Sequence, residues 1–367
     1  MNPWNTAPAQ GSPRRRDFFE GWYFKQVSRD RSETWSFIPG ISRGREPKDD
    51  SAFVQVIEGK TARTWWFDYP ADAFRASSRK LDVWVGASHF SPEGIELDLS
   101  SPEASFSGKL LFGKFSTLPF RPLAPGVMGP FGFVPFMECM HGLVSLDHGL
   151  TGSLVATGNP AAVGNLAAVG NLAAAGSSRA AGSSRAAGPL TAADRVLDFS
   201  GGRGYAEKDW GVSMPSSWIW TQSNNFKDAG DSLMLSIAKI PWLGSSFDGF
   251  LCAGRLGGRN LLEATWTGAR VNDLRVLDDR VELSIASKRC FLELRVGRGR
   301  GGLLRAPVKG LLSRRIAESV DATLFLRLTV AGKVLFEGEA HNAGLEVVDA
   351  GALAAGSQGK DAAPKST

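Results

Sequence analysis

The sequence contains few of the residues that build metal centres, disulfide frameworks or redox sites. Its 367 residues include only three cysteines and four histidines. Cys139, Cys252 and Cys290 lie far apart, so no pair has the spacing of a zinc knuckle or a redox motif. We therefore expect a reducing compartment.

Long apolar runs and the common catalytic motifs are also missing. No apolar stretch approaches the roughly 18 to 20 residues that span a bilayer, which indicates a soluble globular chain. There is no Walker lysine motif and no G-x-S-x-G elbow, and Gly201-Gly-Arg-Gly204 lacks the βαβ context of a dinucleotide loop. The first residues show no apolar signal core, so we expect an intracellular protein, either cytoplasmic or peripheral to a membrane.

Charge of neither sign dominates the chain. The formal net charge is +5, but 37 acidic residues are dispersed among 42 basic ones, so we expect no nucleic-acid partner. One segment differs, because Arg295 to Arg315 holds seven basic residues and no acidic one. It is a solvated loop, a contact with an anionic lipid surface at a membrane or a lipid droplet, or, least favoured, a contact with RNA.

The recurring pattern is that of β-strands. Short apolar and aromatic stretches alternate with period two and are broken by turn residues, with 43 Gly and 19 Pro, whereas amphipathic helix patterns are scarce. We predict an all-β fold of barrels or sandwiches. The predicted strands are 18–27, 35–38, 53–58, 81–85, 95–99, 105–112, 218–226, 232–240, 247–253, 261–267, 281–286, 291–296 and 323–330.

A low-complexity stretch divides the chain. AAVGNL occurs twice from Ala161, and AAGSSR occurs twice from Ala174. Because these repeats are too short for a solenoid unit, we interpret residues 156–193 as a disordered insertion. It separates a first β half, residues 17–155, from a second, residues 194–349. We expect disordered tails over residues 1–16 and 350–367.

Two motifs place carboxyl groups among aromatic rings. If Phe18 to Phe24 is a strand, Glu20 shares a face with Trp22, and an apolar setting disfavours ionisation of a carboxyl, as suits a proton donor. If Tyr205 to Gly211 is extended, Tyr205, Glu207 and Asp209 share a face while Lys208 and Trp210 share the other. Two acids at that spacing hinder each other's ionisation. In both motifs a structural ion pair is the alternative.

Two further segments supply candidate ligand-binding groups. Trp218, Trp220, Gln222 and Asn224 alternate along one strand, a face that could hold a flat ring and its oxygens, although ordinary core packing would look the same. Glu138 and His141 suggest a metal site. They point to opposite faces of a strand and lack a third ligand, so a pocket-lining or hydrogen-bonded role is favoured.

The strings that carry these motifs resemble the tocopherol cyclase family. They are FFEGWYFK from Phe18, FIPGIS from Phe37, APGVMGPFGFVPFMECMHG from Ala124, GGRGYAEKDWG from Gly201, SSWIWTQSNNF from Ser216 and SIAKIPWLGSSFDGF from Ser236. The resemblance runs in order from about residue 17 to residue 348. The insertion and both tails fall outside it.

The resemblance implies two lipocalin-like β-barrel halves and the closure of a prenylated benzoquinol to a chromanol, the ring-forming step of vitamin E biosynthesis. It implies that this reaction needs no metal and no cofactor. A carboxylic acid would protonate the prenyl double bond, and the phenol oxygen would trap the cation in a water-poor pocket. In that scheme Asp209 or Glu207 is the proton donor, with the other carboxylate or Glu20 as base. The remaining expected substrate contacts are Trp22, Trp218 and Trp220 around the cation, Gln222 and Asn224 on the quinol oxygens, and Tyr205, Trp210, Glu138 and His141 in the pocket wall.

Two alternatives stay open at this point. A non-catalytic lipocalin-like carrier of prenylquinones or other apolar ligands would need the same barrel and aromatic residues but no tuned acid. Acid-catalysed hydration of an alkene would use the same protonation and let water trap the cation.

Overall fold

The structure, a computed structural model, describes residues 2–119, 124–135, 137–158 and 194–354. The repeats of the expected insertion, and all but the first residues of the expected C-terminal tail, lie outside these residues. Within them the fold is almost entirely antiparallel β-structure, which confirms the all-β prediction. The described helical elements are short: η1 (Pro47–Asp49), η2 (Ala71–Ala73), η3 (Gly129–Phe133), η5 (Thr265–Thr267) and α1 (Gly351–Ala354).

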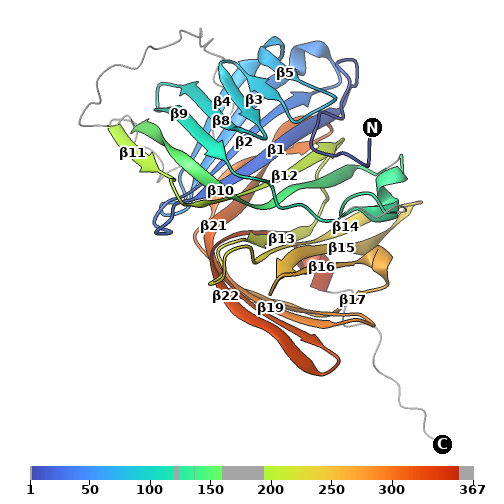
Figure 1. Cartoon of the computed structure of the whole chain (residues 1–367). Helices are drawn as coiled ribbons and strands as arrows, with labels where there is room; N and C mark the ends of the chain where they lie inside the picture. Colours follow the sequence, from blue (N-terminus) through green and yellow to red (C-terminus); the bar gives the residue numbers. More distant parts are fainter. Residues whose placement is uncertain (1, 120–123, 136, 159–193, 355–367) are drawn as a thin grey trace, which may run out of the picture.

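The strands form two large sheets (Figure 1). The first has the order β4-β3-β2-β1-β12-β10-β9-β8-β7-β6-β5, with β11 beside β10. Its strands are β1 (Phe18–Val27), β2 (Thr34–Arg43), β3 (Ser51–Glu58), β4 (Thr64–Pro70), β5 (Phe74–Ala76), β6 (Val83–Val85), β7 (Ser88–Ser91), β8 (Gly94–Ser100), β9 (Ala104–Phe112), β10 (Cys139–Gly158), β11 (Asp194–Asp198) and β12 (Arg203–Gly211).

Aromatic packing shows that the first sheet curls round its own core. Phe106 of β9 contacts Trp65 and Phe67 of β4, with ring centroids 5.4 and 5.9 Å apart, although β9 and β4 are far apart in the strand order. Phe24 of β1 stacks on Phe90 of β7 at 5.5 Å. Edge-to-face and offset contacts of this kind are the favoured geometries of buried rings. The sheet thus encloses a barrel-like core.

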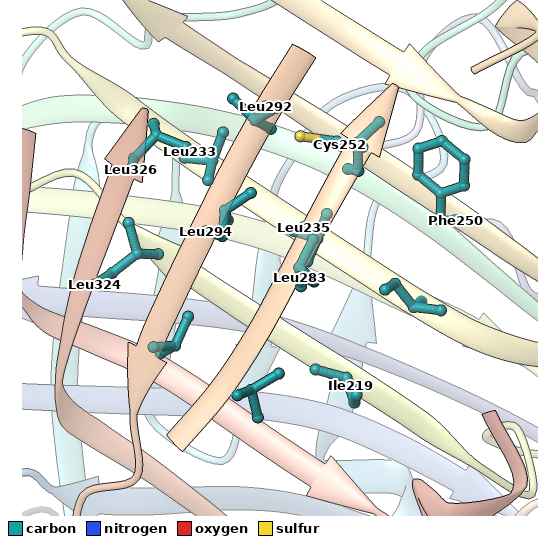
Figure 2. Close-up of a cluster of buried hydrophobic side chains, with 14 of the residues drawn as sticks. Ile219, Leu233, Leu235, Phe250, Cys252, Leu283, Leu292, Leu294, Leu324 and Leu326 are labelled. Carbon is teal, nitrogen blue, oxygen red and sulfur yellow. The ribbon is translucent and has the colours of Figure 1, made fainter. Parts of the chain in front are cut away.

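The second sheet has the order β16-β15-β14-β13-β22-β21-β19-β18-β17, with β20 beside β21. Leucines from β14, β18, β19 and β21 point into one buried cluster (Figure 2). The two sheets are consistent with two lipocalin-like halves. The second is built from β13 (Trp218–Ser223), β14 (Ser232–Trp242), β15 (Ser245–Leu256), β16 (Arg259–Ala264), β17 (Arg270–Val276), β18 (Arg280–Ala286), β19 (Phe291–Gly297), β20 (Gly302–Val308), β21 (Leu311–Val330) and β22 (Lys333–Val348).

A third buried cluster joins the halves and takes side chains from both sheets. Polar contacts fix the junction. Gln55 of β3 exchanges two hydrogen bonds with the backbone of Arg305 in β20, at 3.0 and 2.7 Å. Lys25 of β1 donates to the carbonyl of Asn342 in β22 at 2.6 Å. Buried hydrogen bonds constrain geometry because an unmade one is costly, so the two sheets face each other in a fixed arrangement.

The N-terminal segment lies against the first half, where a disordered tail was expected for residues 1–16. Trp22 donates its indole N–H to the carbonyl of Ala7 at 2.8 Å, and Lys208 donates to the carbonyl of Thr6 at 3.1 Å. Glu20 accepts from the backbone N–H of Gln10 at 2.6 Å. Hydrogen bonds with the buried side chains of Trp22, Lys208 and Glu20 thus hold the N-terminal segment against the first half.

The boundary between the halves also differs from expectation. Residues 194–211 were assigned to the second half, but β11 and β12 pair with β10 and β1 and belong to the first sheet. Hydrogen bonding between strands distant in sequence decides sheet membership, and local pattern carries no such information.

The basic segment Arg295–Arg315 is not the solvated loop considered above. It forms the end of β19, all of β20 and the start of β21. Arg305 pairs with Asp68 at 3.0 Å and Arg314 with Asp349 at 2.6 Å, so part of its charge is neutralised within the fold. Contact with a lipid surface stays a prediction. Among the described residues, no helix has the length and apolar character needed to cross a membrane.

The buried ion pair of Glu20 and Lys208 gives a stability prediction. The two side chains are 2% and 0% exposed, and their charged atoms lie 2.6 Å apart. Glu20→Gln should lower the free energy of unfolding by about 3 to 5 kcal/mol, because it leaves a buried ammonium group without its counter-ion. Chemical denaturation measures this loss. The double variant Glu20→Gln/Lys208→Met should lose less, and equal stability of Glu20→Gln and wild type would contradict the pairing.

Candidate functional site

An apolar cavity lies between the two halves, outside the enclosed core of each. Strands of the first sheet, with η3 and the segment before β10, form one wall, and β13, β14, β15, β20, β21 and β22 form the other. Its volume is about 180 Å³. That exceeds an engineered apolar cavity of about 150 Å³ that admits benzene, so the space can take an organic ring rather than a single water.

Strand alternation decides which side chains reach this cavity. In β12 the side chains of Glu207 and Asp209 line it, whereas Lys208 between them points into the first half. In the paired strand β1, Tyr23 lines the cavity and Glu20 does not. This is the face assignment that the sequence predicted for β12, and it follows from the two-residue period of a strand.

Glu207 is the most densely hydrogen-bonded acid of the cavity. Its Oε2 accepts from the hydroxyl of Tyr205 and from the indole N–H of Trp220, the latter at 3.1 Å, and lies 3.6 Å from Nε2 of His141. The residue is only 5% exposed. Burial raises the pKa of Glu207 to about 7, against the opposing effect of His141 and the two donors. Both of its protonation states are therefore accessible near neutral pH.

His141 and Asp209 form a pair beside Glu207. They are directly opposite each other on β10 and β12, and Nδ1 of His141 lies 2.9 Å from Oδ1 of Asp209. Burial opposes charge on the imidazole, but the carboxylates of Glu207 and Asp209 outweigh burial and raise the pKa of His141 to about 9. Asp209 orients the ring so that Nε2 faces Glu207 and the cavity.

Glu318 of β21 is a cavity residue that the sequence motifs did not reveal. It is fully buried, and its Oε1 accepts from the hydroxyl of Tyr23 at 2.5 Å. Its other oxygen, Oε2, has no hydrogen-bond partner among the described residues. Burial raises the pKa of Glu318 to about 8, and Glu207 adds to the shift. In the sequence, Glu318 alternates with the apolar residues Ile316 and Val320, and this period of two predicts that its side chain points inward with theirs.

Glu346 of β22 completes the acidic lining. It lies directly opposite Glu318 on the neighbouring strand and accepts a hydrogen bond from the indole of Trp218. Burial, with a further contribution from Glu318, raises the pKa of Glu346 well above its usual value. Like charges directly opposite each other on a sheet are unfavourable, so the pair favours neutral carboxyl groups.

Aromatic rings cover the space between these acids. Tyr23 packs edge-on against Trp220 at 5.4 Å and against Tyr205 at 6.4 Å. The Trp220 ring can approach the backbone of β22 closely because Gly344 has no side chain there. A Cβ atom at Gly344 would come within 2.5 Å of the Trp220 ring. The cavity thus combines π-faces with protonatable groups, the combination needed to stabilise a transient cation.

One subset of the site has the composition of a metal site. Ligand atoms of His141, Glu207 and Asp209 all lie within 4.8 Å of one another. Three such ligands with an open position could hold a divalent cation. The expected absence of a metal, argued from Glu138 and His141, did not foresee this grouping, because Glu207 and Asp209 come from a different strand.

The structure brings together only some of the expected site residues. Glu207, Asp209, His141, Trp218 and Trp220 line the cavity, and Tyr205 touches it through Glu207. The others do not line it: Glu20 and Trp22 face the first half, Trp210 packs beside Lys208, Glu138 is exposed, and Gln222 and Asn224 are buried beyond the cavity.

The placement of Asn224 has a clear reason. Its amide donates to Asp147 at 3.0 Å and to the carbonyl of Gly204 at 2.8 Å. Gln222 lies on the same strand face, where its backbone carbonyl accepts from Lys25 at 3.4 Å and its side-chain amide donates to Oδ1 of Asn224 at 3.5 Å. These polar groups are used in joining the halves, and we do not retain them, or Glu20, Trp22, Trp210 and Glu138, as ligand contacts.

Comparison with solved structures describes the fold. CghA matches with a TM-score of 0.54 at 11% identity, over 93% of this chain and 94% of CghA. The structure of CghA with Sch210972 matches with a TM-score of 0.52 at 10% identity, over 90% and 88%. Kievitone hydratase from Nectria haematococca reaches 0.44 at 9% identity, over 90% and 89%. At these identities the two matches with TM-scores above 0.5 show a shared fold only.

Comparison with sequences bears on the family. No curated protein matches the chain significantly. The family model described as tocopherol cyclase-like matches residues 180–240, a range that holds Tyr205, Glu207, Asp209, Trp218 and Trp220. The match contains two of the strings quoted from the sequence, GGRGYAEKDWG and SSWIWTQSNNF, and the first residues of a third. Over residues 180–240 the chain is therefore similar to the tocopherol cyclase-like family.

Proposed function

We propose that this protein is an enzyme that closes a ring by proton transfer, converting a prenylated benzoquinol into a chromanol. The observation that carries the proposal is Glu207, a buried carboxyl poised near neutral pH in an aromatic cavity and held by Tyr205, Trp220 and His141. The tocopherol cyclase-like motifs around it support the same reaction class. A tocopherol-type product, as in vitamin E biosynthesis, is the finer part of the proposal.

The proposed chemistry follows from what the substrate requires. A trisubstituted prenyl double bond must gain a proton to give a tertiary cation, and the phenol oxygen must then attack that carbon and lose its own proton. The rings of Trp218 and Trp220 present π-faces that can stabilise the cation. Nothing is oxidised or reduced, because product and substrate are isomers.

Within this scheme Glu207 is the proton acceptor for the phenol. Two neutral donors and the imidazolium of His141 surround it, and each favours its carboxylate form. This differs from the expectation that Glu207 or Asp209 donates the proton. Asp209 serves as the partner that orients His141.

Ring closure can be followed with 2-geranylhydroquinone as the probe. In deuterium oxide we expect a chromanol with one deuterium on carbon 3 of the new ring, since solvent supplies the proton added to the alkene. The product should form in the presence of EDTA as well. Loss of turnover with EDTA would favour a metal at His141, Glu207 and Asp209.

The same assay separates the two alternatives. A product heavier than the substrate by one water would indicate a hydratase. Tight binding of the probe with no product would indicate a carrier of prenylquinones. In either case the ring-closing proposal is contradicted.

Glu207→Gln should reduce turnover by about 10² to 10⁴ while leaving the melting temperature and probe binding close to wild type. An amide keeps the size and hydrogen bonds of the carboxylate but cannot accept the phenol proton. Glu263→Gln is the matched control, because Glu263 is equally buried, pairs with Arg289 at 3.0 Å and lies away from the cavity. Equal turnover in the two variants would contradict a role for Glu207.

Asp209→Asn should lower the pKa of His141 from about 9, because one of the two carboxylates that raise it is removed. The imidazolium would then lose its proton at a lower pH than in wild type. Nuclear magnetic resonance of the histidine ring follows this titration directly. An unchanged midpoint would show that Asp209 does not act on His141.

A further inference from the structure

The proposed ring closure needs an acid as well as a base. The acid must reach the alkene, and it must be a different residue from the one that accepts the phenol proton. Glu207 lies on β12 of the first sheet, with His141 and Asp209 beside it. The acids on the facing wall, Glu318 and Glu346, come from the second sheet. The cavity therefore has protonatable groups on two opposing walls.

Glu318 has the geometry of a donor. Its Oε1 is occupied by the Tyr23 hydroxyl at 2.5 Å, and Tyr23 in turn accepts from Ser36 at 2.9 Å. Glu318 lines the cavity, and its Oε2 is buried and has no hydrogen-bond partner in the described part of the chain. A buried polar oxygen without a partner is costly, and a ligand would be the group that contacts it.

The charges around Glu318 favour its neutral form. Burial is the main cause, and Glu207, which faces Glu318 from β12, adds to it. Glu346 lies directly opposite Glu318 on β22. Lys25 of β1 opposes them, but its ammonium group is bound to the carbonyl of Asn342 at 2.6 Å and burial lowers its pKa to about 7. Tyr23, the remaining facing group, donates to Glu318 rather than ionising beside it.

We propose that Glu318 is the catalytic acid of the cavity, delivering the proton from Oε2 to the substrate alkene while Glu207 accepts the phenol proton. This inference rests on the ring-closing function proposed above. The O–H bond of Glu318 breaks as a C–H bond forms at the less substituted alkene carbon. The phenol oxygen then bonds to the tertiary carbon, its proton passes to Glu207, and exchange with solvent returns both carboxyl groups to their starting states.

The assignment fits the arrangement of the rings between the two acids. Tyr23 contacts Glu318 through its hydroxyl and Trp220 through its ring, and Trp220 donates to Glu207. A substrate lying along these rings would present its alkene to one wall and its phenol to the other. The isomerisation then takes place between the two sheets, across their junction.

Turnover of 2-geranylhydroquinone in deuterium oxide tests the inference. Glu318→Gln should lower deuterated chromanol formation by about 10² to 10⁴, the usual contribution of a general acid, with binding of the probe retained. Glu263→Gln should react at the wild-type rate. Full activity of Glu318→Gln would overturn the donor role and leave the proposed function standing, whereas an inactive wild-type protein would overturn the function itself.

A second variant keeps the test valid if Glu318→Gln fails to fold. The rate should fall in wild type as pH rises through about 8, where Glu318 loses its proton. Because the hydrogen bond from Tyr23 favours the carboxylate, Tyr23→Phe should move this fall to higher pH. Infrared spectra should show the matching shift in a protonated carboxyl band. An unmoved pH profile and band in Tyr23→Phe would contradict the assignment.

Discussion

The site depends on the cost of burying carboxyl groups between two sheets. Glu207, Glu318 and Glu346 line one cavity, and each has its ionisation disfavoured by burial. Full ionisation of all three would place like charges together in a medium that screens them poorly. The surrounding groups decide which acid carries the charge. His141, Tyr205 and Trp220 favour a carboxylate at Glu207, whereas at Glu318 the carboxylate is favoured by the hydrogen bond from Tyr23 and by the more distant Lys25. Two carboxyl groups with different pKa values in one apolar cavity allow one group to donate a proton to the substrate while the other accepts a proton from it.

The rigid junction between the halves makes this division possible. Side chains of β1 and β12 alternate between the core of the first half and the cavity, so a single strand pair supports both. Lys208 and Glu20 stabilise one face, and Glu207 and Asp209 act on the other. The hydrogen bonds of Gln55 and Lys25 across the junction hold the opposing wall in place. A cavity formed between two domains is also a common position for ligand sites.

The sequence predicted the class of fold and the inward face of β12 because both follow from local alternation. It also predicted five residues that line the cavity, among them Glu207 and Trp220. It failed for Glu20, which shares an aromatic motif with Tyr23 but points to the opposite face. It failed for Glu318 and Glu346, because their place opposite each other depends on the register of β21 and β22, which contains several irregularities. Local patterns do not determine which strands meet across two sheets.

The central claim is that the reaction occurs between the halves, with the phenol at Glu207. The most direct measurement is a crystal structure with the saturated analogue of 2-geranylhydroquinone, which binds but has no alkene to protonate. We predict a phenol oxygen within hydrogen-bonding distance of Glu207, and the side chain against Trp218 with its reduced carbons facing Glu318. A ligand seated inside the core of either half, or one that leaves the cavity empty, would contradict this account.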